Sequence, residues 1–151
     1  MKYHQLLWKG LGMRTVDYQA TVYYHHTDCG GVVYYARYLE FLEEARTALF
    51  GAAGLSLAGL QAEGQWFVVA SQTTEHHAPA RFGDRLTVRT RLCRLSRVRV
   101  AVAYEVLNQA GQRLLTAETV LASVGADLAP RRIDEAVRAA LLPYLEAEAE
   151  S

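Results

Sequence analysis

Residues 35–50 read YARYLEFLEEARTALF, a run without glycine or proline that predicts one long helix. Gly51 and Gly54 follow this run and predict where the helix ends. Apolar residues recur along it at spacings of three and four, which marks one face of a helix: Tyr38, Leu42, Ala45 and Leu49. This face must be buried against another element, so the helix predicts a partner layer.

The rest of the chain supplies that layer, because apolar and polar residues alternate there with the period of a strand. Strands are predicted at residues 15–24, 66–77, 86–92, 98–106 and 114–124, with a hairpin loop at residues 108–111. Residues 56–63 predict a short helical segment. Residues 133–150 predict a tail helix that Pro143 must break or kink.

This order, one strand, a long helix, four strands and a tail helix, predicts an α+β fold. The last four strands are predicted to join through short turns, so the sheet is predicted to be antiparallel and to wrap around the one long helix. Its two edge strands need cover, and pairing with another copy is the usual remedy. A single domain is predicted over residues 1–151, with a leader at 1–14 and a C-terminal helical tail at 131–151.

The composition excludes several classes of protein. The hydrophobic share of 51% and the charged share of 21% are those of a globular chain. Lys+Arg and Asp+Glu number 16 each, which argues against nucleic-acid binding. Cys29 and Cys93 form no C-x-x-C pair, and no apolar run approaches the roughly 20 residues of a membrane span. We therefore expect a reduced, cytoplasmic protein with no membrane span.

The loop before the helix, residues 23–34, reads YYHHTDCGGVVY and gathers several reactive side chains. His25 and His26 are expected to point to opposite sides of an extended chain, and their spacing to Asp28 and Cys29 matches no zinc signature. The sequence thus predicts neither a metal site nor a cofactor. For Cys29, a small thiol packed in a tight turn is favoured over a nucleophile.

Asp28 is the most informative residue of this loop. It lies six or seven residues before the helical pattern, which is too far for a helix N-cap. Gly30 and Gly31 free the backbone between them, so the carboxylate and the first helix amides can face one ligand. A carboxylate beside such donors is the minimal equipment for acyl transfer, namely a nucleophile or general base with an oxyanion stabiliser.

These residues also resemble a known signature. The stretch TDCGGVVYYARYLEFLEEAR, residues 27–46, is similar to the pattern T-D-x-x-G-x-V-Y-x-x-x-Y-x-x-x-x-E-x-x-R of hotdog-fold acyl-CoA thioesterases, in the group of 4-hydroxybenzoyl-CoA thioesterases and YbgC-like proteins. HHAPARFGDRLTV, residues 76–88, resembles a second segment of that group. The resemblance covers roughly residues 16 to 130 and implies a hotdog fold, in which a sheet wraps a central helix.

The resemblance also implies the activity and its residues. Asp28 falls on the catalytic aspartate, and Tyr35 falls where the first helical turn offers an amide to the thioester oxygen. Many YbgC-like proteins have histidine at the position of Tyr35. This chain therefore lacks that imidazole but keeps the backbone amide. Substrate contacts are expected at Gly31 and Val32. For the phosphates of CoA, the resemblance suggests four residues far along the chain: Arg94, Ser96, Arg97 and Arg131.

The resemblance further implies a homodimer or homotetramer whose active sites lie between subunits. The expected substrate is an acyl-CoA, which is hydrolysed to a carboxylic acid and free CoA. Two alternatives stay open from the sequence: a thioesterase acting on acyl carrier protein thioesters, and a non-catalytic module that binds acyl-CoA. Neither the acyl group nor the choice between nucleophile and general base is predicted.

Overall fold

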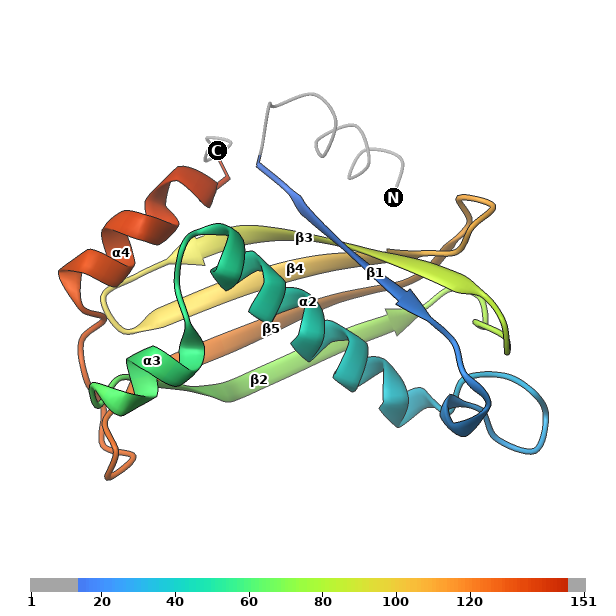
Figure 1. Cartoon of the computed structure of the whole chain (residues 1–151), viewed down its shortest axis with the longest axis horizontal. Helices are drawn as coiled ribbons and strands as arrows, with labels where there is room; N and C mark the ends of the chain where they lie inside the picture. The colour runs from blue at the N-terminus through green and yellow to red at the C-terminus, as the bar shows by residue number, and fades with distance from the viewer. Residues whose placement is uncertain (1–13, 147–151) are drawn as a thin grey trace.

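A five-stranded antiparallel sheet and one long helix build the body of the protein (Figure 1). The computed structural model describes residues 14–146. The elements follow one another as β1 (Val16–Thr21), η1 (Tyr24–His26), η2 (Tyr35–Arg37), α2 (Tyr38–Ala52), α3 (Leu57–Ala62), β2 (Trp66–His76), β3 (Arg85–Leu95), β4 (Arg99–Leu107), β5 (Arg113–Val124), α4 (Glu135–Leu141) and η3 (Leu142–Tyr144). This confirms the predicted α+β fold class and order of elements. Most of the predicted leader, residues 1–13, and the end of the tail, 147–151, lie outside the described residues.

The strands lie in the order β1-β3-β4-β5-β2, and every neighbouring pair is antiparallel. The pairs β3–β4 and β4–β5 are hairpins, as predicted. Strands β2 and β3 do not form a hairpin, although they follow each other in the chain. The neighbours of β3 are β1 and β4, and β2 lies beside β5. Residues 77–84 therefore cross the end of the sheet, which the prediction of short turns missed.

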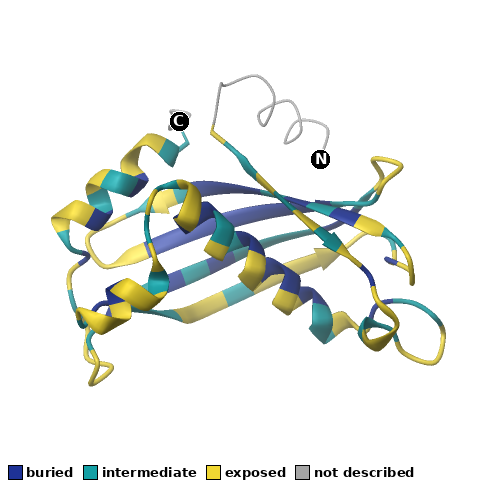
Figure 2. Cartoon of the chain, in the orientation of Figure 1, coloured by how far each residue is buried: buried dark blue, intermediate teal, exposed yellow. Residues whose placement is uncertain are grey.

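Helix α2 lies across one face of the sheet and its predicted apolar face is confirmed (Figures 1 and 2). Its inward residues are almost fully buried: Tyr38, Leu42, Ala45 and Leu49. They join one core with sheet residues that include Leu86, Val88 and Val102. Burial of a leucine such as Leu42 stabilises the fold by about 1.5–3 kcal/mol, so this contact holds the sheet around the helix.

Element ends differ from the predicted ones where local turns intervene. Strand β1 stops at Thr21 and the 3₁₀ turn η1 follows, so Tyr24 is 77% exposed and not an inward strand residue. Helix α2 continues through Gly51, and Gly54 is the residue with the left-handed backbone, at φ 85°. The tail helix α4 ends at Leu141, and Pro143 lies in η3, as the predicted break requires.

The two sheet edges differ in length and exposure. Strand β2 has 11 residues, most of them exposed, and appears yellow over much of its length in Figure 2. Strand β1 is shorter, with 6 residues, and its inward side chains are half-buried. Among the helices of residues 14–146, none is long and apolar enough to cross a membrane.

Candidate active site

The loop that carries Asp28 is a small hairpin. Thr27 and Val33 form an antiparallel bridge, and the Asp28 amide donates to the Val32 carbonyl at 3.0 Å. The Gly31 amide closes the turn on the Asp28 carbonyl at 3.1 Å. Gly31 has φ 78°, a left-handed conformation that strains any residue with a Cβ. The glycine pair therefore allows the tight reversal that presents Asp28.

The Asp28 side chain caps this turn and not the helix. Its Oδ1 accepts the Gly30 amide at 2.8 Å, while Asp28 itself is exposed. Within residues 14–146, no hydrogen bond is recorded for its other oxygen, Oδ2. The prediction that Asp28 is not a helix N-cap is confirmed, because Tyr34 caps η2 and Arg37 precedes α2. One carboxylate oxygen is thus held and the other faces outward.

The crossing segment 77–84 is hydrogen-bonded to the Asp28 hairpin. The Val33 amide donates to the Ala80 carbonyl at 2.9 Å, and Val32 forms a bridge with Arg81. The Ala80 amide in turn donates to the Tyr38 hydroxyl at 3.0 Å. Tyr38 is 3% exposed in the first turn of α2, and burial raises the pKa of its hydroxyl. The hairpin is therefore fastened to the helix through one buried tyrosine.

The helix start lies directly beside this hairpin. The amides of Tyr35 and Ala36 have no acceptor among the hydrogen bonds of residues 14–146, as expected for a first helical turn. Tyr35 is 67% exposed, and its ring lies 4.8 Å from that of Tyr34. An open cavity of about 300 Å³ adjoins this turn and is lined by Val33, Tyr35, Tyr38, His76, His77, Ala78 and Pro79. Asp28 does not line this cavity within one chain.

The predicted contacts for CoA divide into two groups. Gly31 and Val32 lie in the hairpin and meet the crossing segment, where the Phe82 amide donates to the Gly31 carbonyl at 3.3 Å. The other four belong to segments at the opposite end of the sheet in Figure 1. Strand β3 has 11 residues, so its two ends lie about 30 Å apart. One chain does not bring these four residues to Asp28.

Each of the distant residues has local contacts of its own. Arg94 forms an ion pair with Glu118 at 3.3 Å. The Ser96 hydroxyl accepts the Arg99 amide at 3.0 Å and shapes the β3–β4 turn. The Arg97 carbonyl accepts the Ile133 amide at 2.8 Å, while its side chain is exposed.

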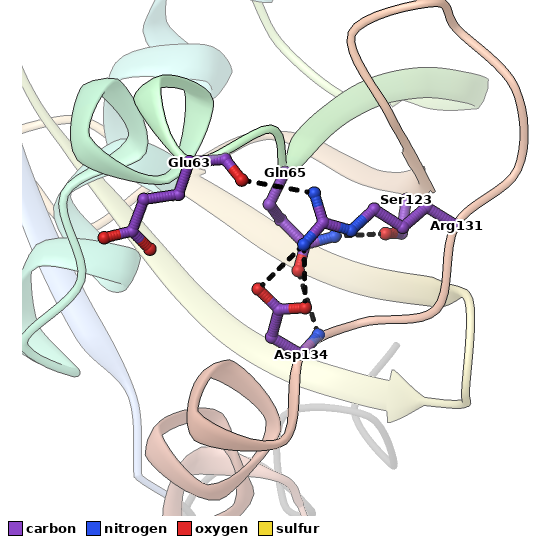
Figure 3. Close-up of polar contacts among 5 residues, drawn as sticks. All are labelled: Glu63, Gln65, Ser123, Arg131 and Asp134. Carbon is purple, nitrogen blue, oxygen red and sulfur yellow. Dashed lines mark hydrogen bonds and ion pairs between the residues drawn. The ribbon is translucent and has the colours of Figure 1, made fainter.

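Arg131 holds together two loops at this far end (Figure 3). Its guanidinium donates to the Asp134 carboxylate at 3.0 Å and to the Glu63 carbonyl at 3.4 Å. The structure therefore gives Arg131 an internal structural role, alongside the predicted contact with phosphate.

The two histidines before Asp28 lie differently from the prediction. Their rings are 4.1 Å apart, because η1 is a 3₁₀ turn and not extended chain. Even so, no group of three or more His, Cys, Asp or Glu side chains within residues 14–146 is arranged to hold a metal ion. Cys29 is exposed on the hairpin and not packed, because the tight reversal turns its side chain to solvent.

Sequence reasoning missed the contribution of the crossing segment. His76 and His77 are exposed, and they line the cavity at the helix start. The His76 ring makes an edge contact with the Tyr38 ring at 5.4 Å, and His77 Nε2 lies 3.0 Å from the Thr116 hydroxyl. Pro79 and the Gly83-Asp84 pair signalled a break there, but nothing local shows that the break spans the sheet.

Comparison with known proteins assigns this arrangement to a family. The sequence profile of the Thioesterase-like superfamily matches residues 22–141, which include the Asp28 hairpin, the helix and all four later strands. The chain belongs to the Thioesterase-like superfamily. The acyl-CoA thioester hydrolase YbgC of Escherichia coli O6:H1 is 37% identical over 103 residues, which cover 68% of this chain and 77% of that protein.

Other members of the superfamily support the same assignment. The 1,4-dihydroxy-2-naphthoyl-CoA hydrolase of Thermosynechococcus vestitus is 33% identical over 104 residues, 68% of this chain and 71% of that protein. The crystal structure of a 1,4-dihydroxy-2-naphthoyl-CoA thioesterase from Synechocystis superposes with a TM-score of 0.79 at 25% identity, covering 85% of this chain and 96% of that one. These matches confirm the predicted hotdog fold and the predicted enzyme class, a thioester hydrolase.

Proposed function

We propose that this thioesterase hydrolyses an acyl-CoA to a carboxylic acid and free CoA, with Asp28 as the reacting carboxylate. The observation that carries the proposal is the exposed Asp28 on its glycine turn, beside a helix start with free amides. The relatives named for CoA thioesters support the choice of substrate. The reaction adds water across the thioester bond: the acyl carbon gains the hydroxyl, and the sulfur leaves as a thiol.

In this mechanism, the carboxylate of Asp28 starts the reaction, and the helix start stabilises the negative charge that develops on the substrate. Asp28 either attacks the acyl carbon or takes a proton from the attacking water. Negative charge then develops on the thioester oxygen, where the amides at Tyr35 and Ala36 and the helix dipole stabilise it. Tyr35 offers its amide for this role, and its exposed ring leaves room for the acyl group.

The substitution Asp28→Asn tests this proposal. The asparagine oxygen still accepts the Gly30 amide, so the turn is kept while the charge is lost. We expect turnover of acyl-CoAs, followed by release of free thiol, to fall about 100-fold or more, with unchanged melting temperature and ligand binding. The matched control is Cys29→Ser, the next residue of the same turn, which should leave the rate unchanged. Undiminished hydrolysis by Asp28→Asn would refute the role of Asp28.

The same assay separates the alternative functions. Hydrolysis of acyl carrier protein thioesters but not of acyl-CoAs would replace CoA with the carrier protein as partner. A shift of the melting temperature by acyl-CoAs without any hydrolysis would indicate a binding module. A panel with aromatic and short aliphatic acyl groups would identify the acyl group, and the cytoplasmic location stays a prediction.

We also propose that two chains pair along β2. This strand has 11 residues and an edge without a neighbour among the described strands, which is a site for association with another chain. A two-fold axis at this edge would reverse the partner sheet, so that its far end lies at the near end of the first. Loop 125–132 of the partner, which includes its Arg131, would then approach the first chain's His76 end. This arrangement would bring predicted CoA contacts of one chain close to the Asp28 end of the other.

A further inference from the structure

His26 occupies the point where three segments of the site meet. Its amide donates to the carbonyl of Tyr23, the second residue after β1, at 3.0 Å, which ties it to the end of that strand. Its carbonyl accepts the Tyr34 amide at 3.0 Å, which ties it to the residue before the helix. The Asp28 hairpin is the chain between these two attachments. A displacement of His26 therefore moves Asp28 relative to the helix start.

The imidazole adds a third attachment. Its Nδ1 accepts the Tyr23 amide at 2.8 Å, and the ring lies 4.9 Å from the Phe41 ring of α2. Phe41 is 3% exposed, so the imidazole rests on a fixed part of the core. Residue 26 is the third residue of η1 counted from the cap, the position from which a side chain reaches back to the cap amide in a capping box.

We propose that His26 is a positioning residue: its neutral imidazole clamps the Asp28 hairpin to the helix, and protonation of Nδ1 opens the clamp. This inference rests on the proposed function of Asp28. An imidazole nitrogen accepts a hydrogen bond only through a free lone pair, so the bond from the Tyr23 amide requires Nδ1 to be unprotonated and the ring proton of the neutral imidazole to be on Nε2. In the imidazolium, Nδ1 becomes a donor that faces another donor, and the bond is lost.

The surroundings of His26 favour the neutral ring. Burial is the main cause that lowers the pKa of His26, and the positive charges of His25 and Arg37 lower it further. Glu40 and Glu44 on α2 act in the opposite direction without reversing the result. The folded state therefore binds a proton here less readily than the unfolded chain. The clamp is intact above a pH of about 6.5 and opens as the pH falls through the lowered pKa of His26.

Three variants test the clamp by their pH profiles. His26→Leu keeps apolar packing on Phe41 but removes the acceptor, so kcat at pH 7.5 should fall about 10- to 100-fold by displacement of Asp28. His26→Gln restores an acceptor at the capping position that does not titrate, so it should keep kcat within about threefold of the wild type. In His26→Gln, the part of the fall in kcat at acid pH that comes from protonation of His26 should be absent. His25→Leu, at the adjacent exposed histidine, is the control. It should keep the rate at pH 7.5 and the acid-side fall in rate, with that fall moved to higher pH because the charge of His25 no longer lowers the pKa of His26.

A second readout is independent of turnover. Nitrogen-15 NMR of the wild-type ring should show a proton on Nε2 and a bare Nδ1 at pH 7.5, with titration below pH 6.5. The Tyr34 amide should have a lower protection factor against hydrogen exchange in acid than at pH 7.5. Protonated Nδ1 at pH 7.5, or equal rates and equal profiles for His26→Leu and wild type, would overturn the clamp. Full activity of Asp28→Asn would instead overturn the proposed function, and the NMR result would still decide the clamp.

Discussion

At the scale of single residues, a chain of hydrogen bonds crosses the core from the helix to the edge strand. Arg46 donates to the Tyr104 hydroxyl at 3.4 Å, and Tyr104 donates to Thr119 at 2.8 Å. Thr119 donates onward to Gln72 on β2 at 2.6 Å. The direction is fixed because a guanidinium can only donate. Arg46, the last residue of the sequence signature, therefore has a structural partner in Tyr104.

Removal of the Tyr104 hydroxyl should weaken the fold measurably. Tyr104 is 1% exposed, and burial raises the pKa of its hydroxyl, so the group stays protonated and donates throughout the neutral range. Tyr104→Phe leaves Thr119 without its donor and should lower the free energy of unfolding by about 1–3 kcal/mol in urea titrations. Tyr24→Phe removes a hydroxyl from a residue that is 77% exposed and should change nothing. Equal stability of the two variants would contradict the importance of this chain.

The two cysteines should differ sharply in reactivity. Burial, with a hydrogen bond to Glu118, raises the pKa of Cys93 to about 12, whereas Cys29 is exposed. Only the thiolate reacts with disulfide reagents, so one fast thiol per folded chain is expected at pH 8. Cys29→Ser should abolish the fast phase and also remove background from assays of CoA release. A remaining fast thiol in Cys29→Ser would show that Cys93 is accessible.

At the scale of elements, Gln65 joins three segments at the far end of the sheet (Figure 3). Its side chain contacts the Ser123 hydroxyl at the end of β5 and accepts the Asp134 amide at 2.9 Å before α4. Gln65 is fully buried directly before β2. Its amide group therefore sets how α4 packs on the sheet, while Arg131 closes the same junction from outside.

Replacement of this amide group by an apolar one should loosen the junction. Gln65→Leu is similar in volume but leaves the Asp134 amide and the Ser123 hydroxyl without partners. The expected loss is about 1–3 kcal/mol of unfolding free energy, together with faster hydrogen exchange at the start of α4. Gln61→Leu on the exposed side of α3 is the matched control. Unchanged exchange in Gln65→Leu would argue that apolar packing alone holds α4.

The sequence predicted the elements that carry strong periodicity and missed the long-range connections. The buried face of α2 follows from Tyr38, Leu42, Ala45 and Leu49, because the spacing of a helix is local information. The neighbours of β2 could not be predicted in this way, because its pairing with β5 depends on residues some 50 positions away. The exposed turn of Asp28 was predicted from Gly30 and Gly31. The hydrogen bond between the His26 ring and the Tyr23 amide was not predicted. It needs the 3₁₀ turn η1, and the alternating pattern of residues 15–24 predicted a strand there instead.

At the scale of the whole molecule, the residues predicted for the site lie at opposite ends of one chain. The Asp28 hairpin and the helix start lie at one end of the sheet, whereas the β3–β4 turn and loop 125–132 lie at the other (Figure 1). A cavity of about 130 Å³ opens beside the free edge of β2, and its walls include Arg46, Phe50, Phe67 and Val69. The walls also include Glu43, Thr47 and Gln61, so this cavity combines apolar and polar side chains.

A charge at this edge should separate the chains and stop turnover. Val69 is 50% exposed on β2, and a two-fold axis perpendicular to this strand would bring both copies of the substitution Val69→Lys into the interface between the paired strands. Light scattering should then show a single-chain mass with retained circular dichroism, and hydrolysis should fall with dimer content if each site includes the partner's far end, as proposed. Leu142→Lys, at a residue of η3 that is also 50% exposed and has no predicted role in the site, is the control. A mass of four chains in the wild type would reveal the predicted tetramer as a second association step. An intact dimer with full activity in Val69→Lys would place the subunit interface elsewhere on the molecule.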